Sequence, residues 1–388
     1  MEYMVRDLFL ALIRSEITGA ELDAELLMLV NAENLRAIYN ISKPQDLTHL
    51  IANALLSRDL VKNDELLNLY KREQVAAVFR HVQIRHELNR LRRAFDKTEI
   101  DYLLLKGSVI RRYYPRPEQR TSCDIDIFVK ESALEAAAAV MTDTLGYKFD
   151  IRTPHEIAYY SPAKVHVELH FDLIENDERV REVLSHVWEH SHPDGDDTRG
   201  FVMDNEMFMV YHFAHMAKHF SGGGCGVRPF IDLWIAEEKM GFDRNAVLLM
   251  LRECGLDKFA ESAMALSAVW LSGNDHTAIT RVMEEYILGS AIYGTLENRV
   301  TIQQAQRGGK LKYMLSRIFM PCAKLKKIYP RLEKYPILLP FYQVKRWCRY
   351  LSRRGTSRAK IEARIAGNIA EEKQATMMEM LRELGLDD

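Results

Sequence analysis

The sequence predicts an α+β fold, mostly helical overall, in which a small mixed sheet is flanked by N-terminal and C-terminal helical regions. Two observations lead to this fold class. The segments DIDIFV (124–129) and KVHVELHFDL (164–173) alternate between apolar and polar residues, which is typical of strands. Outside residues 99–200, apolar residues recur mainly at intervals of three and four, which is the spacing of amphipathic helices.

Residues 1–98 form the predicted N-terminal helical region. The first helix is indicated by the spacing of Val5, Leu8, Phe9 and Leu12. A long helix with a polar face is predicted over residues 63–95, and its apolar positions are Val75, Val78, Phe79 and Val82.

Residues 99–200 form the predicted α/β core. The apolar run IDYLLLKG (100–107) ends at a glycine, and a short helix follows it before the strand DIDIFV. The alanine-rich segment 131–146 predicts a second helix with Gly146 as its C-cap. Strands are then expected at 147–151, 156–161 and 164–173. The Gly-, Pro- and Asp-rich segment 190–200 predicts a loop and a domain boundary, after which residues 201–388 are expected to be helical.

The composition excludes several classes of protein. The five cysteines are scattered and contain no C-x-x-C pair, which argues against a disulfide framework and a cysteine zinc site. The N-terminal residues lack the pattern of a signal peptide, and no apolar run of about 18 residues predicts a transmembrane segment. We therefore expect a cytoplasmic protein.

The net charge of −2 conceals an uneven distribution. Residues 301–370 contain 17 lysines and arginines but only two acids, Glu333 and Glu362. This basic segment is either a set of solvated helix faces or a surface for an anionic partner such as a triphosphate, a nucleic acid or an acidic lipid surface. Its aromatic and basic residues would also suit nucleic acid, although we expect its apolar residues to pack the last helices, namely Ile337, Leu338, Leu339 and Phe341.

The strongest chemical signal is a glycine-serine turn followed by two aspartates. Gly107 allows a phosphate to approach the backbone closely, and Ser108 adds a hydroxyl donor at the start of a short helix whose free N–H groups favour anions. Asp124 and Asp126 lie two residues apart on a strand, so both carboxylates project from one face. Such a pair resists joint ionisation unless a hard divalent cation binds it. The combination favours phosphoryl or nucleotidyl transfer to a hydroxyl group.

These residues resemble a known family. The segments LLLKG, YYPRPEQRTSCDIDIFV, LGY and VHVELHFDL, followed by HMAKHF, GVRPFIDLW and IYPRLEKYPILLPFYQVKRW, are similar to the bacterial group called uncharacterised nucleotidyltransferases, or nucleotidyltransferase family 5. That group belongs to the polymerase-β-like superfamily, and the resemblance covers most of the chain. It implies a catalytic α/β core with helical flanks, an NTP donor and Mg²⁺ or Mn²⁺. It does not supply the acceptor.

The resemblance assigns roles to individual residues. Gly107 and Ser108 match the turn that holds the triphosphate, and Asp124 and Asp126 match the two metal-binding aspartates. Glu168 matches the third carboxylate, which would favour deprotonation of the acceptor hydroxyl. Asp172, on the same strand, competes with Glu168 for this role. The segment between Ser108 and Asp124 is longer than is usual in the family and contains two prolines, which would give the pocket a distinct rim.

Five basic residues are further candidates for binding the nucleotide. Lys106 and Arg120 flank the turn and the aspartates, and the alternative for each is a surface ion pair with Glu118 or Asp101. The other three candidates are expected to reach the nucleotide from the helical region, although a structural Arg228–Asp232 pair is equally consistent with the sequence. These three are Lys218, His219 and Arg228.

His166 and His170 share a face with Glu168, so a His-x-Glu-x-His zinc site is one interpretation. We favour the alternative that both histidines line the cleft beside the magnesium ligands.

The sequence thus predicts an enzyme that transfers an NMP from an NTP to a hydroxyl or phosphate and releases pyrophosphate. Its acceptor is left open between a small molecule, a protein, a lipid-linked sugar and RNA. Two alternatives remain: a catalytically silent module of the same fold that binds nucleotide or nucleic acid, and a toxin or defence nucleotidyltransferase that acts on tRNA.

Overall fold

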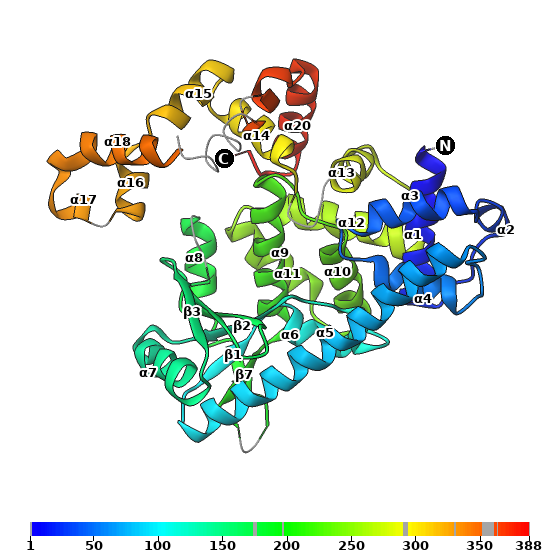
Figure 1. The fold of residues 1–388 in the computed structure, drawn as a ribbon, viewed down its shortest axis with the longest axis horizontal. Helices are drawn as coiled ribbons and strands as arrows, with labels where there is room; N and C mark the ends of the chain where they lie inside the picture. The colour runs from blue at the N-terminus through cyan, green and yellow to red at the C-terminus, as the bar shows by residue number, and fades with distance from the viewer. Residues whose placement is uncertain are drawn as a thin grey trace. The chain divides into compact units, whose positions relative to one another are not determined.

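The computed structural model describes residues 2–173, 177–195, 198–289, 294–329, 331–350, 361–362 and 364–387. The chain forms two compact units, and Figure 1 colours the ribbon by residue number from the N-terminus to the C-terminus. The first unit comprises residues 1–216 and 227–284, and the second comprises residues 217–226 and 285–388. The sequence predicted three regions, 1–98, 99–200 and 201–388, from the kind of secondary structure in each. The two compact units divide the chain at other positions, and the three regions stay a prediction. No helix within the described ranges is long and apolar enough to cross a membrane.

A single seven-stranded mixed sheet lies in the first unit, with the strand order β3-β4-β5-β2-β1-β7-β6. The pairs β2–β5 and β1–β7 are parallel, and the other four neighbouring pairs are antiparallel. The α+β prediction is therefore confirmed. The strands are β1 (Tyr102–Leu104), β2 (Asp124–Val129), β3 (Lys148–Arg152), β4 (Glu156–Tyr160), β5 (His166–His170), β6 (Ser191–Pro193) and β7 (Gly200–Met203).

The first five strands occur where the sequence predicts them, but the last two do not. Segment 190–200 was predicted to be a loop, yet β6 lies within it and β7 begins at its end. β7 pairs in parallel with β1, so this segment extends the sheet beyond β1. The prediction failed because β6 is only three residues long, contains a proline, and has no apolar alternation to identify it.

The N-terminal helices pack largely against one another, and the last of them, α5, also contacts the sheet. They are α1 (Glu2–Thr18), α2 (Ala24–Leu27), α3 (Ala32–Ser42), α4 (Thr48–Leu56) and α5 (Asp64–Lys97). The apolar positions predicted for the first helix are all buried. The Asn63 side chain caps α5 by accepting a hydrogen bond from the backbone N–H of Leu66. The long helix α5 contacts β2 and can be followed beside the sheet in Figure 1.

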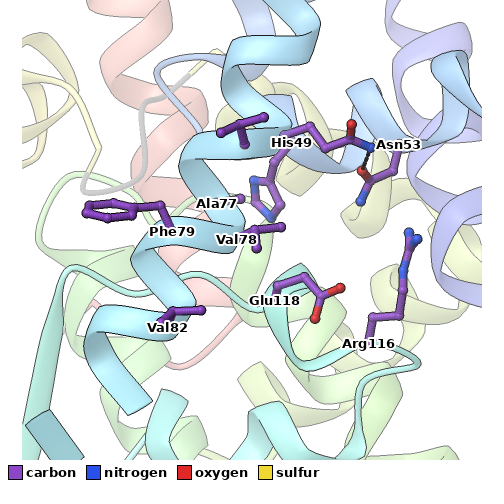
Figure 2. A pocket seen from close by; sticks show the side chains of 10 residues that line it. His49, Asn53, Ala77, Val78, Phe79, Val82, Arg116 and Glu118 are labelled. Carbon is purple, nitrogen blue, oxygen red and sulfur yellow. Dashed lines mark hydrogen bonds between the residues drawn. The ribbon is translucent and has the colours of Figure 1, made fainter. Parts of the chain in front are cut away.

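The apolar stripe predicted on α5 is present but exposed. Val75, Val78, Phe79 and Val82 are all largely accessible to solvent. They line an open pocket of about 460 Å³ together with residues from α4 and from the segment that follows β1. Figure 2 shows Val78, Phe79 and Val82 on α5 and the polar side chain of Glu118 nearby. Amphipathic spacing thus identified the helix, but this apolar face does not enter the core.

The remaining helical elements of the first unit fall into two groups along the chain, one between β1 and β3 and one after β5. Between β1 and β3 they are α6 (Gly107–Ile110), η1 (Arg111–Tyr113), η2 (Pro117–Gln119), η3 (Glu131–Ala133), α7 (Leu134–Ala139) and the π-helical turn η4 (Val140–Thr144). After β5 they are α8 (Glu178–Ser185), α9 (Asn205–Ser221), α10 (Arg228–Lys239), α11 (Arg244–Glu253), α12 (Asp257–Ser272) and α13 (Ala278–Leu288). The last residues of α9 and α13 belong to the second unit.

The second unit is helical in its described residues. Its further elements are α14 (Leu296–Gln306), α15 (Lys310–Ile318), α16 (Cys322–Ile328), α17 (Arg331–Lys334), η5 (Pro336–Leu338), α18 (Leu339–Tyr350) and α20 (Glu371–Glu383). The expectation that the apolar residues of 337–341 pack the last helices is wrong for three of the four. Ile337, Leu338 and Phe341 are exposed, whereas Leu339 packs against a small core of Leu325, Leu332 and Tyr342. Apolar spacing alone does not reveal whether another element covers a face.

The segment between α6 and β2 is fixed to α10 by a buried ion pair. Arg120 Nε lies 2.7 Å from Asp232 Oδ1, and both side chains are largely buried. The Tyr114 hydroxyl donates a hydrogen bond to the same Asp232 oxygen, at 2.7 Å. The Arg120 guanidinium also packs against Gly107, where a Cβ would lie 3.2 Å from Arg120 Nη1. Asp232 therefore holds the turn at Gly107 and the segment after it against α10.

We predict that Asp232→Ala lowers the free energy of unfolding by about 3–5 kcal/mol, because it leaves the Arg120 charge buried without its carboxylate. Chemical denaturation would measure the loss. The control is Glu135→Ala, which removes an exposed ion pair with Arg152 and should cost less than about 1 kcal/mol. Equal losses in the two variants would contradict the structural role of Asp232.

Candidate functional site

Two neighbouring strands bring the predicted carboxylates together. β2 and β5 run parallel, with Asp126 opposite Glu168 and Asp124 opposite His166. Alternate residues of a strand share a face, and paired residues of neighbouring strands point the same way. The side chains of Asp124, Asp126, Glu168 and His170 are therefore placed on one face of the sheet. This geometry joins residues that are more than 40 positions apart in the sequence.

Asp126 is the most buried member of this group, with 4% of its surface exposed. Its Oδ1 atom lies 2.7 Å from Lys106 Nζ and 3.0 Å from His170 Nε2. Burial opposes ionisation of Asp126, but the Lys106 ammonium and the hydrogen bond from His170 hold its pKa well below the usual range. Asp126 is therefore a buried carboxylate that stays charged because two cationic groups contact it.

His170 links the two strands of the site. Its Nε2 atom lies 3.3 Å from Glu168 Oε2, and its Nδ1 atom lies 3.3 Å from Glu156 Oε2 on β4. Burial alone would lower the pKa of His170, but the hydrogen bonds to Asp126 and Glu168 raise it to about 9. His170 is thus protonated at neutral pH and bridges three carboxylates.

Asp124 ionises less readily than Asp126. Burial raises its pKa, and the nearby negative charges of Asp126 and Glu168 raise it further, to about 6 despite the opposing charge of Lys106. The side chain is only partly exposed. A cation bound next to Asp124 would relieve this repulsion, as the sequence analysis expected for an aspartate pair.

Lys106 stands at the N-terminus of α6 in an unusual backbone conformation, with φ 47° and ψ −122°. Residues with side chains rarely adopt this region, and doing so costs about 1–3 kcal/mol. Gly107 and Ser108 follow as the first two residues of α6. The strained position directs the Lys106 ammonium to Asp126, so the turn and the carboxylate group are joined directly.

The predicted alternative to phosphate binding, a surface ion pair with Glu118 or Asp101, is wrong for both Lys106 and Arg120. Lys106 does not pair with Glu118 or Asp101 but with Asp126, and Arg120 pairs with Asp232. Both ion pairs are largely buried rather than on the surface. Their predicted contact with phosphate stays a prediction.

Arg228 is held by a second aspartate, Asp46. Arg228 Nη2 lies 2.5 Å from Asp46 Oδ2, and Arg80 Nη1 lies 3.1 Å from Asp46 Oδ1. The Thr121 hydroxyl also donates a hydrogen bond to Asp46. The alternative of an Arg228–Asp232 pair is therefore wrong, because Asp232 binds Arg120 instead. Arg228 remains a candidate for nucleotide binding.

Lys218 and His219 lie in the last turn of α9, within the second unit. Their predicted contact with nucleotide stays a prediction.

Glu168 and Asp172 compete for the role of third carboxylate, and the structure places Glu168 opposite Asp126. Asp172 instead lies 3.2 Å from His155 Nδ1 and 3.4 Å from Arg181 Nη2, measured from its Oδ2 atom. Among the described residues, Asp126, Glu168 and His170 offer carboxylate and imidazole atoms that all lie within 4.8 Å of one another. This spacing allows one ion to contact all three, with Asp124 on the same face.

The donor atoms of this group fit a hard or borderline divalent ion. Carboxylate oxygens outnumber the single imidazole nitrogen, which favours Mg²⁺ or Mn²⁺. In the zinc interpretation both histidines would be ligands. His166, however, sits with Nδ1 3.5 Å from Glu168 Oε1 and Nε2 3.8 Å from Asp150 Oδ2, whereas His170 faces Asp126 and Glu168. The arrangement supports His170 rather than His166 as a neighbour of the metal.

Sequence reasoning missed several residues that shape the site. Strand alternation placed His170 on the correct face but gave no sign that it would bond Asp126. Nothing local in the sequence signalled that Asp232 and Asp46 would hold Arg120 and Arg228. Tyr211 on α9 was also missed: burial raises the pKa of its phenol, which lies close enough to Lys106 to interact electrostatically.

Comparison with known proteins identifies the family to which the chain belongs. The family described as uncharacterised nucleotidyltransferase matches residues 31–272, which is more than half of the chain and includes the whole sheet. No curated protein and no solved structure matches the chain. The sequence match, together with the carboxylates on β2 and β5, leads to one conclusion: the chain belongs to the uncharacterised nucleotidyltransferase family.

Proposed function

We propose that this enzyme transfers a nucleoside monophosphate from an NTP to a hydroxyl or phosphate acceptor in a metal-dependent reaction that releases pyrophosphate. The observation that carries the proposal is the register of β2 and β5, which sets Asp126 opposite Glu168 with Asp124 on the same face. Three carboxylates at one place suit the binding of divalent cations, and few other reactions need them beside a glycine-serine turn.

In the proposed reaction, an acceptor oxygen attacks the α-phosphorus of the NTP. The bond from that phosphorus to the bridging oxygen breaks, and pyrophosphate leaves with the bonding electrons. Glu168 takes the proton of the acceptor hydroxyl. Asp124, Asp126 and Glu168 would hold Mg²⁺ or Mn²⁺, which would neutralise charge on the triphosphate and acidify the acceptor.

The residues around the turn would position the donor. Backbone N–H groups at Gly107 and the Ser108 hydroxyl are proposed to bind the triphosphate. Lys106 would contact it as well, because it directly precedes Gly107 and its ammonium already contacts Asp126. The Arg120–Asp232 pair would keep Gly107 in place. We propose Arg228, Lys218 and His219 as outer contacts to the nucleotide.

The reaction is tested with NTPs labelled at the α-phosphate or the γ-phosphate, incubated with the enzyme, Mg²⁺ or Mn²⁺ and a cell extract. We predict that α-label, but not γ-label, appears on an acceptor, and that Asp126→Ala lowers the rate at least about 1,000-fold. Asp143→Ala, which changes an exposed aspartate on η4, serves as the control and should retain the wild-type rate. Full activity of Asp126→Ala would disprove the proposal. NTP binding without any transfer would instead support the silent binding module.

Glu168 and Asp172 can be separated as candidates for the third carboxylate. We predict that Glu168→Gln lowers the transfer rate about 100-fold or more, because it removes the group placed opposite Asp126. Asp172→Asn should change the rate less than about threefold, because Asp172 pairs with His155 and Arg181. The reverse order of effects, measured with the same labelled NTP, would assign the role to Asp172.

The raised pKa of Asp124 predicts a pH-dependent effect on stability. Its carboxyl is protonated more readily in the folded protein, with a pKa of about 6, than in the unfolded chain. Asp124 therefore destabilises the metal-free fold as the pH rises from about 4 to above 6, and the full cost is present at higher pH. We predict that metal-free Asp124→Asn is about 3 kcal/mol more stable than the wild type near pH 8.

Thermal unfolding of both proteins as a function of pH measures this difference. It should vanish below about pH 3, where Asp124 is protonated in both the folded and the unfolded state. Saturating Mn²⁺ should stabilise the wild type more than Asp124→Asn, since only the wild type has the charged ligand. Equal stabilisation of both proteins by Mn²⁺ would argue that Asp124 does not bind metal.

A further inference from the structure

The second unit exposes an unusual number of large apolar side chains. Half of the exposed large apolar residues in the described parts of the chain lie between residues 311 and 361, a segment of about 50 residues. Leu311 is 74% exposed and Ile337 is 87% exposed. Scattered exposed apolar residues are common, but a concentration of this kind marks an interaction surface.

On α15 these residues share one face. Leu311, Leu315 and Ile318 are spaced four and three residues apart, and all are exposed. The opposite side of the helix carries Tyr313, which is buried in a small core with Val300 and Ala366. The exposed stripe is therefore not a core face left open by chance, because α15 already packs through its other side.

The segment from η5 into α18 repeats this arrangement. Ile337, Phe341 and Val344 are exposed at spacings of four and three, while Tyr342 is buried with Leu325 and Leu332. The two helices are joined at one end. Trp347 Nε1 on α18 donates a hydrogen bond to the carbonyl oxygen of Ile318, and the Trp347 ring packs edge-on against Phe319. The helices can be followed in Figure 1 as α15 and α18.

Lysines accompany both apolar stripes, and acids are almost absent. We call the exposed residues together the basic apolar surface: Leu311, Leu315, Ile318, Phe319, Ile337, Phe341 and Val344 with Lys310, Lys312, Lys334 and Lys345. Glu362 does not contribute negative charge at this surface, because it is largely buried against Arg317 and accepts a hydrogen bond from Tyr313. Of the two acids within residues 301–370, only Glu333 is exposed.

We propose that the basic apolar surface binds the headgroups and outer acyl region of an anionic lipid bilayer. A short helix with apolar residues on one face and lysines beside them is suited to lie in the plane of a membrane interface. Lysines near such an interface are attracted by acidic headgroups. This inference goes beyond the proposed transferase activity and does not rest on it.

Two other partners fit the surface less well. Nucleic acid would be bound by the lysines and by aromatic stacking, but Leu311, Leu315, Ile318 and Val344 are aliphatic and cannot stack on bases. A second copy of the same surface would bring lysines against lysines, and the resulting repulsion would oppose burial of the apolar residues. An anionic bilayer, by contrast, offers negatively charged headgroups to the lysines and an apolar interior to the apolar side chains.

The full-length protein is tested by co-sedimentation with vesicles of phosphatidylcholine alone and with vesicles of an equimolar mixture of phosphatidylcholine and phosphatidylglycerol. We expect binding to the mixed vesicles only. The triple variant Leu311→Ser, Leu315→Ser, Ile318→Ser should weaken it at least about tenfold, because it removes the inserted side chains. Lys310→Gln with Lys312→Gln should weaken it about fivefold for each lysine.

The pair Phe341→Ser and Val344→Ser supplies a second, independent test on α18 and should also weaken binding. Leu249→Ser is the matched control, since Leu249 is 60% exposed on α11 of the first unit and should not affect binding. Binding that is unchanged in both serine variants would overturn the proposal. Absence of vesicle binding, combined with binding to single-stranded RNA or with dimers that the triple variant abolishes, would overturn it in favour of that partner.

Discussion

The site depends on how the fold balances the repulsion between the carboxylates that β2 and β5 bring to one face of the sheet. Their parallel register fixes Asp126 and Glu168 on one face, because a shift of either strand by one residue would turn that strand's side chain to the opposite face and separate the two carboxylates. Buried charges of one sign are tolerated only when cations or proton donors balance them. The fold supplies Lys106 from the turn before α6 and His170 from β5 itself. The rest of the site follows from how these groups are held.

The need for a cation beside Asp126 explains the backbone strain at Lys106. Glycine would adopt its backbone conformation more easily, but glycine has no ammonium to place against Asp126. The ion pair therefore offsets a local cost, and the Arg120–Asp232 pair secures the next residue of the turn, Gly107. Two ion pairs, each largely buried, thus fix consecutive residues of the turn, Lys106 and Gly107. The Arg120–Asp232 pair in turn depends on α10, more than 100 residues further along the chain.

The sequence predicted the parts of the fold that have a local signal. Alternation identified β2 and β5 and placed Asp124, Asp126, Glu168 and His170 on the correct faces. It could not show which strands are neighbours, so the register that selects Glu168 over Asp172 came only from the structure. β6 was missed because three residues with a proline have no periodicity.

Partners distant in sequence could not be predicted either. Asp46 and Asp232 are ordinary acids in helical regions, and only the tertiary fold brings them to Arg228 and Arg120. Amphipathic spacing likewise located the apolar face of α5 but not its exposure. Spacing reports which residues share a face, whereas exposure depends on what else packs there.

The charges of the site also restrict how a donor nucleotide enters. Asp124, Asp126 and Glu168 would meet a triphosphate that is itself strongly negative. Lys106 and His170 are the cationic groups in contact with these carboxylates, and both are already engaged with Asp126. A bare triphosphate would therefore add repulsion at a largely buried group of carboxylates, where charges are poorly screened. We expect the nucleotide to bind together with its divalent counter-ion, and Lys106 to exchange Asp126 for phosphate once that ion balances the carboxylate. The Lys106 ammonium, which stabilises Asp126 in the metal-free fold, would then hold the donor.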